Sequence, residues 1–305
     1  MSAEATVLTD SLDVKADSIN YWKTSRKAFL MFTQNSFVNW SAGGNNSISG
    51  LLRVNITKNY NNDKHLIWNN ELKGSYGLNK ESKRELRKTE DRFELNSTFG
   101  YRKDTESDWY YSAKFNFRTQ YTNGYRYPNT EKPISKLFAP AYLFLGVGSE
   151  YALKEQKLRI YISPITNKTT FVFSNSLANE GAFGVTKATY DEDGVLLTRG
   201  KHTKMEFGTL VTGEWKTDVM ENIKMENILI LYSDYVNNYG NIDVNWEFNL
   251  DMTINKYIKA NVGAHILFDD DDKTKKDIDD DGVLDILEAK IQLKQILGVG
   301  ISYTF

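Results

Sequence analysis

An acidic stretch near the C-terminal end of the sequence has the spacing of a calcium-binding loop. Counted from Asp277, carboxylates stand at positions 1, 3, 5, 9 and 12, and a glycine stands at position 6, where the EF-hand loop needs a sharp turn. Calcium takes six to eight oxygen ligands, which closely spaced carboxylates and a backbone carbonyl can supply. The predicted ligands are Asp277, Asp279, Asp281, Val283 through its carbonyl, Asp285 and Glu288.

The surroundings of this loop differ from those of a calcium sensor. No helical pattern flanks it, and it connects two predicted strands, so we expect the ion to act as a structural clamp. The alternative is a solvated acidic loop, since the run 269–272 is also entirely Asp.

Other chemistry is poorly supported by the sequence. The absence of cysteine removes thiolate nucleophiles, disulfides and zinc-thiolate sites. A serine or water nucleophile needs a base, and the only histidines are His65, His202 and His265. His202 follows Asp191 and Asp193 in a long polar segment, which is more typical of a solvated loop than of a catalytic site. We therefore expect no enzymatic activity and no catalytic residues.

The composition points to a strand-rich chain. Its 305 residues include 18 Tyr, 16 Phe and 6 Trp but only 4 Pro. No apolar run approaches the roughly 18 residues that a transmembrane helix needs. The formal net charge is -2, so the composition gives no sign of the positively charged surface that nucleic-acid-binding proteins have. Nucleic acid is therefore not an expected partner.

Strict alternation of apolar and polar residues is the main structural signal. From Trp109 to Tyr121 the odd positions are mostly aromatic or apolar while the even ones are mostly polar, and residues 242–254 and 291–305 repeat the pattern. Segments of this length suit strands that cross a bilayer at a tilt. The twelve predicted strands are 28–40, 47–60, 65–78, 91–102, 109–121, 140–153, 158–173, 204–216, 222–235, 242–254, 257–268 and 291–305. Pro164 cannot donate to a ladder, so we expect a bulge or an early strand end there.

The connections between the predicted strands alternate in length, as in bacterial outer-membrane barrels. The turns assigned to the periplasmic side are 61–64, 103–108, 154–157, 216–221 and 255–256. The opposite connections are mostly long and polar: 79–90, 122–139, 174–203 and 269–288, with shorter ones at 41–46 and 236–241.

This pattern predicts the organisation of the whole chain. We expect a transmembrane, antiparallel, up-and-down β-barrel over residues 25–305 with both termini in the periplasm, after a polar periplasmic segment at residues 1–24. The first residues lack a secretory signal, which favours either a cytosolic protein or a processed chain with an added start Met. The strand pattern favours the second reading.

A soluble β-sandwich or lipocalin-like barrel would also show alternation. Apolar faces this aromatic on nearly every strand would overfill a small soluble core, however. The final Tyr303-Thr304-Phe305 also resembles the recognition signal of outer-membrane proteins. The expected location is therefore the outer membrane of a Gram-negative bacterium, with membrane lipid as a partner.

Four stretches carry a resemblance to a known family: residues 35–47 (NSFVNWSAGGNNS), 138–142 (FAPAY), 163–168 (SPITNK) and 297–305 (LGVGISYTF). They resemble a Bacteroidota family of outer-membrane barrels that is catalogued as a domain of unknown function. The resemblance implies an outer-membrane barrel and no established activity. In the first stretch, Gly43 and Gly44 could take positive φ and form a tight outer turn.

The predicted inward faces carry charges of both signs. Their charged residues are Glu71, Lys73, Arg92, Glu94, Lys114, Arg118, Lys204, Glu206, Glu214, Lys224, Glu226, Asp243, Glu247, Asp251, Lys290 and Lys294. Mixed charge argues against strong ion selectivity, and interdigitated pairs would close the bore, so we expect a mostly closed polar lumen.

Two function classes remain open. The first is an accessory or scaffold subunit of an outer-membrane assembly, which contacts other outer-membrane proteins through long loops such as 174–203. The second is a narrow, porin-like channel for small polar solutes. The balanced lumen charge and the long loops favour the first.

Overall fold

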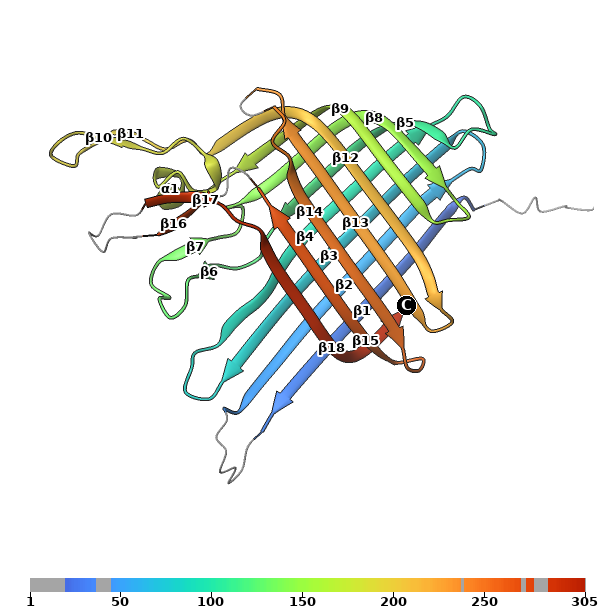
Figure 1. The fold of residues 1–305 in the computed structure, drawn as a ribbon, viewed down its shortest axis with the longest axis horizontal. Coiled ribbons are helices and arrows are strands. Elements are labelled where there is room, and N and C mark those ends of the chain that lie inside the picture. The colour runs from blue at the N-terminus through green and yellow to red at the C-terminus, as the bar shows by residue number, and fades with distance from the viewer. Residues whose placement is uncertain (1–19, 37–44, 237–238, 270–272, 277–284, 305) are drawn as a thin grey trace, which may run out of the picture.

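The computed structural model describes residues 20–36, 45–236, 239–269, 273–276 and 285–304. Twelve antiparallel strands close into one barrel (Figure 1), which confirms the predicted all-β, up-and-down architecture. They are β1 (Trp22–Asn35), β2 (Ser47–Asn61), β3 (Leu66–Glu81), β4 (Arg87–Tyr101), β5 (Trp109–Thr119), β8 (Ala141–Leu153), β9 (Leu158–Phe171), β12 (Thr203–Met220), β13 (Ile223–Asp234), β14 (Asp243–Thr253), β15 (Ile258–Phe268) and β18 (Gln292–Thr304).

Each strand pairs with its neighbour along the chain, and β1 closes the ring against β18. Strand β1 begins at Trp22, three residues before the expected start of the barrel domain at residue 25. The predicted polar segment 1–24 falls mostly on residues 1–19, outside the described part of the chain. No helix among the described residues is long and apolar enough to cross a membrane.

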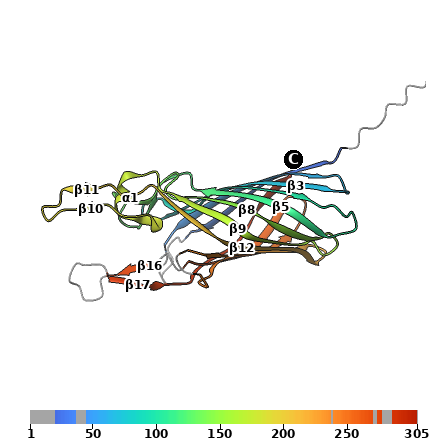
Figure 2. The ribbon, with the colours of Figure 1, turned by 90° about the horizontal axis from the view of Figure 1, so that it is seen from above.

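The longest connections gather at one end of the barrel (Figure 2). One long connection carries the short strands β6 (Gly124–Tyr125) and β7 (Pro133–Ser135). Residues 172–202 contain α1 (Asn175–Asn179), η1 (Ala182–Gly184) and the hairpin of β10 (Thr189–Tyr190) and β11 (Leu196–Thr198). The last one carries β16 (Lys273–Lys276) and β17 (Asp285–Ala289). We call the end that bears them the outer end.

The expected long loop at 79–90 was wrong. Strand β3 continues to Glu81 and β4 begins at Arg87, so only residues 82–86 connect them. The ladder continues here through Asn79 opposite Arg87, although neither residue is apolar. A paired strand end needs no apolar face where it extends beyond the layer that the apolar residues define, so hydrophobic alternation underestimates its length.

The predicted irregularity at Pro164 is a bulge in a strand that continues past it. Opposite β12, Thr166 pairs with Gly208 and Ser163 with Leu210, so two residues of β9 face one of β12. The Ser163 hydroxyl lies 2.9 Å from the carbonyl oxygens of both Val147 and Ile165 and is fully buried. The side-chain alternation changes phase here, because Ser163 and Thr166 both point inward.

Candidate functional site: a lumen crossed by ion pairs

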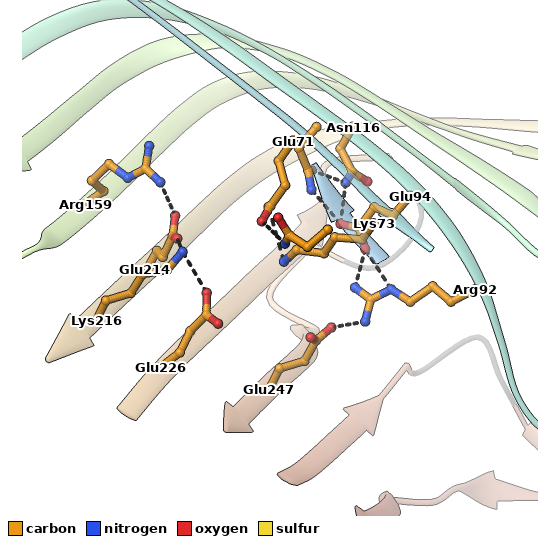
Figure 3. A network of polar contacts seen from close by, with 12 residues as sticks. Glu71, Lys73, Arg92, Glu94, Asn116, Arg159, Glu214, Lys216, Glu226 and Glu247 are labelled. Atoms are coloured by element: carbon orange, nitrogen blue, oxygen red, sulfur yellow. Dashed lines mark hydrogen bonds and ion pairs between the residues drawn. The ribbon is translucent and has the colours of Figure 1, made fainter. Parts of the chain in front are cut away.

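The best-defined cluster of functional groups lies inside the barrel and centres on Arg92 of β4 (Figure 3). Its guanidinium pairs with Glu94 on the same strand and lies 2.7 Å from Glu247 Oε1 on β14. Strands β4 and β14 are six places apart in the ring of twelve, which makes them opposite. The Arg92–Glu247 pair therefore spans the bore.

Neighbouring groups extend this cluster along the wall. Glu94 accepts hydrogen bonds from the side-chain amides of Asn96 at 2.9 Å and Asn116 at 3.0 Å. Lys73 lies 3.2 Å from Glu71, which also accepts a 2.7 Å bond from Asn55. Because each carboxylate has a cation or amide donor beside it, the cost of burying these charges is offset locally.

A second chain of ion pairs runs across β9, β12 and β13. Arg159 lies 2.6 Å from Glu214, and Lys216 joins Glu214 at 2.6 Å to Glu226 at 2.9 Å (Figure 3). This arrangement alternates positive and negative groups on adjacent strands. It leaves no uniform field that would draw one sign of ion through the bore.

Further contacts cross the lumen at other levels. Lys168 of β9 lies 2.9 Å from Asp243 of β14, and its ammonium stands 5.0 Å from the ring centre of Tyr232. The ammonium of Lys114 on β5 donates to the Thr212 hydroxyl of β12 at 2.9 Å. In addition, Arg53 donates to Asn261 at 3.0 Å, and Lys294 of β18 pairs with Glu90 of β4. Side chains from non-adjacent strands thus meet at several heights.

Towards the outer end lies a cavity of about 360 Å³, whose lining includes the Lys294–Glu90 pair and Arg92. Its lining includes Arg118, Tyr142, His265, Leu293 and Lys294. The Arg118 guanidinium lies over the Tyr142 ring at 5.2 Å from its centre. The cavity is mixed in character, because apolar and cationic groups share its lining with the carboxylates of Glu90 and Asp91.

The outer connections form a structured cap beside this cavity. Val172, Leu177, Ala178 and Val185 pack with Ala139 into a buried apolar cluster, which ties residues 172–202 to the preceding outer connection. The hairpin β10–β11 projects from this cap (Figure 1). Its Tyr190, Val195, Leu196 and Leu197 side chains are exposed.

Many of the predicted inward charges are found in the lumen, but several of the residues that organise it were not predicted. Lys224 is an exception among the predicted ones, because its side chain is 71% exposed. The unpredicted residues are Arg53, Glu90, Glu150, Arg159, Lys168 and Lys216. For Arg159 and Lys168 the change of phase at Pro164 obscured the alternation that could have identified them.

The predicted calcium ligands lie largely outside the described residues. This applies to Asp277, Asp279, Asp281 and Val283, whereas Asp285 and Glu288 belong to β17. Lys276 of β16 pairs with Asp285, so the two ends of segment 277–284 are adjacent. Within the described residues there is no group of three or more His, Asp or Glu that could hold a metal. The predicted turn at Gly43 and Gly44 is likewise outside the described part.

The three histidines each make a local structural contact. His65 Nδ1 lies 2.9 Å from the Arg102 carbonyl oxygen, and His202 Nδ1 lies 2.7 Å from that of Val172. His265 Nε2 contacts the side-chain oxygen of Asn245 at 2.9 Å. None of these contacts joins a histidine to a serine.

The fold and this site together define a closed, twelve-stranded antiparallel β-barrel with a charge-paired lumen. A family model described as a protein of unknown function (DUF3078) matches residues 32–125. No curated protein matches the chain.

Solved structures that resemble this chain include two barrels. The translocator domain of the autotransporter NalP from Neisseria meningitidis is 7% identical, with a TM-score of 0.38, over 95% of this chain and 90% of that one. An outer membrane channel from Pseudomonas putida F1 is 10% identical, with a TM-score of 0.41, over 97% and 99% of the two chains.

Proposed function

We propose that this protein is an outer-membrane β-barrel of a Gram-negative bacterium that serves as an accessory or scaffold subunit, with a lumen closed to solutes. The membrane location is supported by the outward faces of the strands. Leu30, Leu52, Leu145, Val147 and Leu297 are all exposed on the barrel wall. An apolar belt on every side of a barrel is what lipid contact requires, whereas in water it would promote aggregation.

Aromatic residues at both borders of the belt support the same location. Beside the short turns, the exposed side chains are Trp68, Tyr101, Trp109, Tyr257 and Tyr303. Towards the outer end they are Phe32, Tyr121, Phe173, Phe207 and Tyr235. Such girdles are typical of the two membrane–water interfaces of outer-membrane barrels.

The closed lumen rests on one observation above all, the Arg92–Glu247 pair between opposite strands. A solute passing through the bore would have to separate these charges or go around them. The contacts of Lys168 with Asp243 and of Lys114 with Thr212 obstruct the remaining cross-section at other heights. If solutes cannot pass through the bore, the barrel can still act through the contacts that its outer surface makes with other molecules.

The outer cap supplies that surface. Residues 172–202 have their own small apolar core, so they hold a defined shape above the barrel. The β10–β11 hairpin presents Tyr190 and Leu197, which are 52% and 63% exposed, away from the wall. Exposed apolar side chains on an ordered hairpin are a typical protein contact. We infer that this hairpin contacts another outer-membrane protein, and that the role is not enzymatic.

The experiment is native electrophoresis of membranes solubilised in mild detergent. The wild-type protein should migrate in a complex larger than the barrel alone, and a variant with Tyr190→Ser, Leu196→Ser and Leu197→Ser should migrate alone. A control variant changes Lys83, Arg84 and Leu86 to Ser in the short connection 82–86 and should keep the complex. Migration of the wild type as a lone barrel would count against the scaffold role.

A narrow channel for small polar solutes is the second candidate. The outward-facing cavity of about 360 Å³ favours it, because solute could enter from outside as far as the ion pairs. This candidate requires the pairs to separate, and ionic conductance distinguishes the two.

We further propose that segment 277–288 binds calcium as a structural clamp. The register of β16 and β17 supports this, because the pairing of Lys276 with Asp285 brings the two ends of residues 277–284 together; Glu288 lies three residues further along β17. Without a cation, the six carboxylates of this short segment would repel one another.

A further inference from the structure

The pairing of β1 with β18 is the shortest in the barrel. Strand β1 pairs with β2 along its whole length, from Trp22 to Asn35. It pairs with β18 only from Lys27 to Met31, opposite Thr304 to Gly300. Strand β18 meanwhile pairs with β15 from Gln292 to Ile301. Within the described strands, the edge of β18 that faces β1 is therefore unpaired above Gly300.

This unpaired stretch lies in the outer half of the wall, since β18 descends from the outer end. Met31 packs where the pairing stops, and a Cβ added to Gly298 would lie 1.7 Å from its sulfur. Beyond this point the outer ends of the two strands stand apart (Figure 1). We call the gap between residues 32–35 and 292–299 the open seam.

An open seam has a physical consequence in a membrane. Unpaired backbone N–H and C=O groups are costly in hydrocarbon and are tolerated where polar groups or water reach them. Acyl chains alone cannot satisfy these groups. The polar head and ester carbonyls of a lipid can, if they lie against the strand edge.

The outer cavity lies directly behind this edge. Gln292, Leu293 and Lys294 of the unpaired stretch form part of its lining. Most of its charged groups are already paired: Arg92 with Glu247, Lys294 with Glu90, and Asp91 with Lys88.

The remaining cation, Arg118, is positioned to receive an anion. It stacks on Tyr142 and makes no ion pair within 4.0 Å in the described part of the chain, although Glu94 lies near enough to interact with it electrostatically. A guanidinium with donors facing a cavity fits a phosphate or carboxylate group by its fork geometry.

We propose that the open seam and the cavity behind it bind one membrane lipid with an anionic head group. The head group lies against Arg118, and the acyl chains leave through the seam over Phe32 and Leu297, which are 57% and 78% exposed. The seam gives the lipid a route from the outer leaflet that does not pass through the bore. This inference goes beyond the scaffold role and stands independently of it.

Cysteine cross-linking tests the seam in a chain that has no cysteine of its own. If the ladder continued upward, Gln34 would face Leu297, so the test variant carries Gln34→Cys and Leu297→Cys. The control carries Leu30→Cys and Ile301→Cys, which are paired. In vesicles of phosphatidylcholine and phosphatidylglycerol, the control should form the internal disulfide and the test pair should not. Equal internal cross-linking would overturn the open seam, and a cross-link between two copies would assign the seam to a partner strand instead.

Lipid retention tests the head-group site. The probe is phosphatidylglycerol in equal amount with phosphatidylcholine, counted by native mass spectrometry after extraction of the barrel. Arg118→Ala should lower bound phosphatidylglycerol about tenfold relative to wild type. The control, Arg126→Ala, removes an exposed arginine from an outer connection and should change it less than twofold.

A soluble competitor separates a lipid from a free anion. Glycerol phosphate at millimolar concentration should leave the bound phosphatidylglycerol in place, because it lacks the chains that occupy the seam. Displacement by glycerol phosphate, or equal retention by Arg118→Ala and wild type, would overturn the proposal. Electrophoretic mobility before and after heating verifies that each variant is folded.

Discussion

Arg92 and Glu247 lie 2.7 Å apart on strands that stand opposite each other in the barrel. Both side chains are largely buried, and Arg92 also pairs with Glu94. One guanidinium therefore holds two carboxylates from two walls, which ties the walls together as well as filling the space between them.

Removing this guanidinium should destabilise the barrel. Arg92→Ala leaves Glu94 and Glu247 buried without their cation, and breaking a buried pair on one side costs about 3–5 kcal/mol. Lys154→Ala is the control, because its pair with Asp63 is exposed and should contribute at most about 1 kcal/mol. The measurement is urea unfolding in vesicles, followed by tryptophan fluorescence. Equal unfolding midpoints for the two variants would show that the lumen pair adds no stability.

The bulge at Pro164 requires a glycine at position 148 of the neighbouring strand β8. A Cβ at Gly148 would lie 2.0 Å from the Ile162 carbonyl oxygen and 2.7 Å from the Ser163 Cα. Because both are backbone atoms, no rotamer change can relieve the contact. Gly148→Ala should therefore cost about 3 kcal/mol, the upper end of the usual range for overpacking.

The control for this substitution is Gly50→Ala, since a Cβ there has no neighbour within 4 Å. Folding yield into detergent micelles, read from the heat-dependent shift in electrophoretic mobility, compares the two variants. If Gly148→Ala folds as well as Gly50→Ala, the close approach of β8 and β9 at the bulge is wrong.

Two valines of similar exposure test the membrane belt. Val147 is 65% exposed in the middle of β8, and Val195 is 60% exposed in the outer hairpin. Lysine at the lipid-facing midplane of a barrel costs about 2–4 kcal/mol, and lysine in water costs little. Val147→Lys should thus lower stability in vesicles while Val195→Lys does not. Similar effects of the two substitutions would argue that β8 does not face lipid.

Calcium should bind segment 277–288 and stabilise the folded protein by mass action. Extracellular calcium modules have dissociation constants of about 10⁻⁴–10⁻³ M, and we expect a value in this range. Isothermal titration should show saturable binding to wild type and none to Asp281→Ala or Glu288→Ala. Identical heats for all three proteins would leave a solvated acidic loop as the better account.

Alternation predicted every strand of the barrel because the outside and the lumen of a barrel impose opposite demands on successive residues. It placed the end of β3 too early, since polar residues such as Asn79 still pair at the rim. The missing N–H of Pro164 predicted the irregularity in β9. Alternation did not show which residues point inward after the bulge, and Lys168 is one of them.

The cross-lumen partners could not be predicted in the same way. Alternation assigns Arg92 and Glu247 to the inward faces, but which inward residues meet depends on strand tilt and stagger around the closed ring. The short β1–β18 pairing is equally invisible, because the residues of both strands alternate normally along the unpaired stretch. These contacts can be identified only from the three-dimensional structure of the closed barrel.

Ionic conductance in planar bilayers tests the closed lumen most directly. The wild-type barrel should give little or no steady current, because the pairs of Arg92 with Glu247 and of Lys168 with Asp243 fill the bore. A variant with Arg92→Ser, Glu247→Ser, Lys168→Ser and Asp243→Ser should give discrete channel steps, provided that it folds. Large, stable steps in the wild-type protein would contradict the account and make a solute channel the better description.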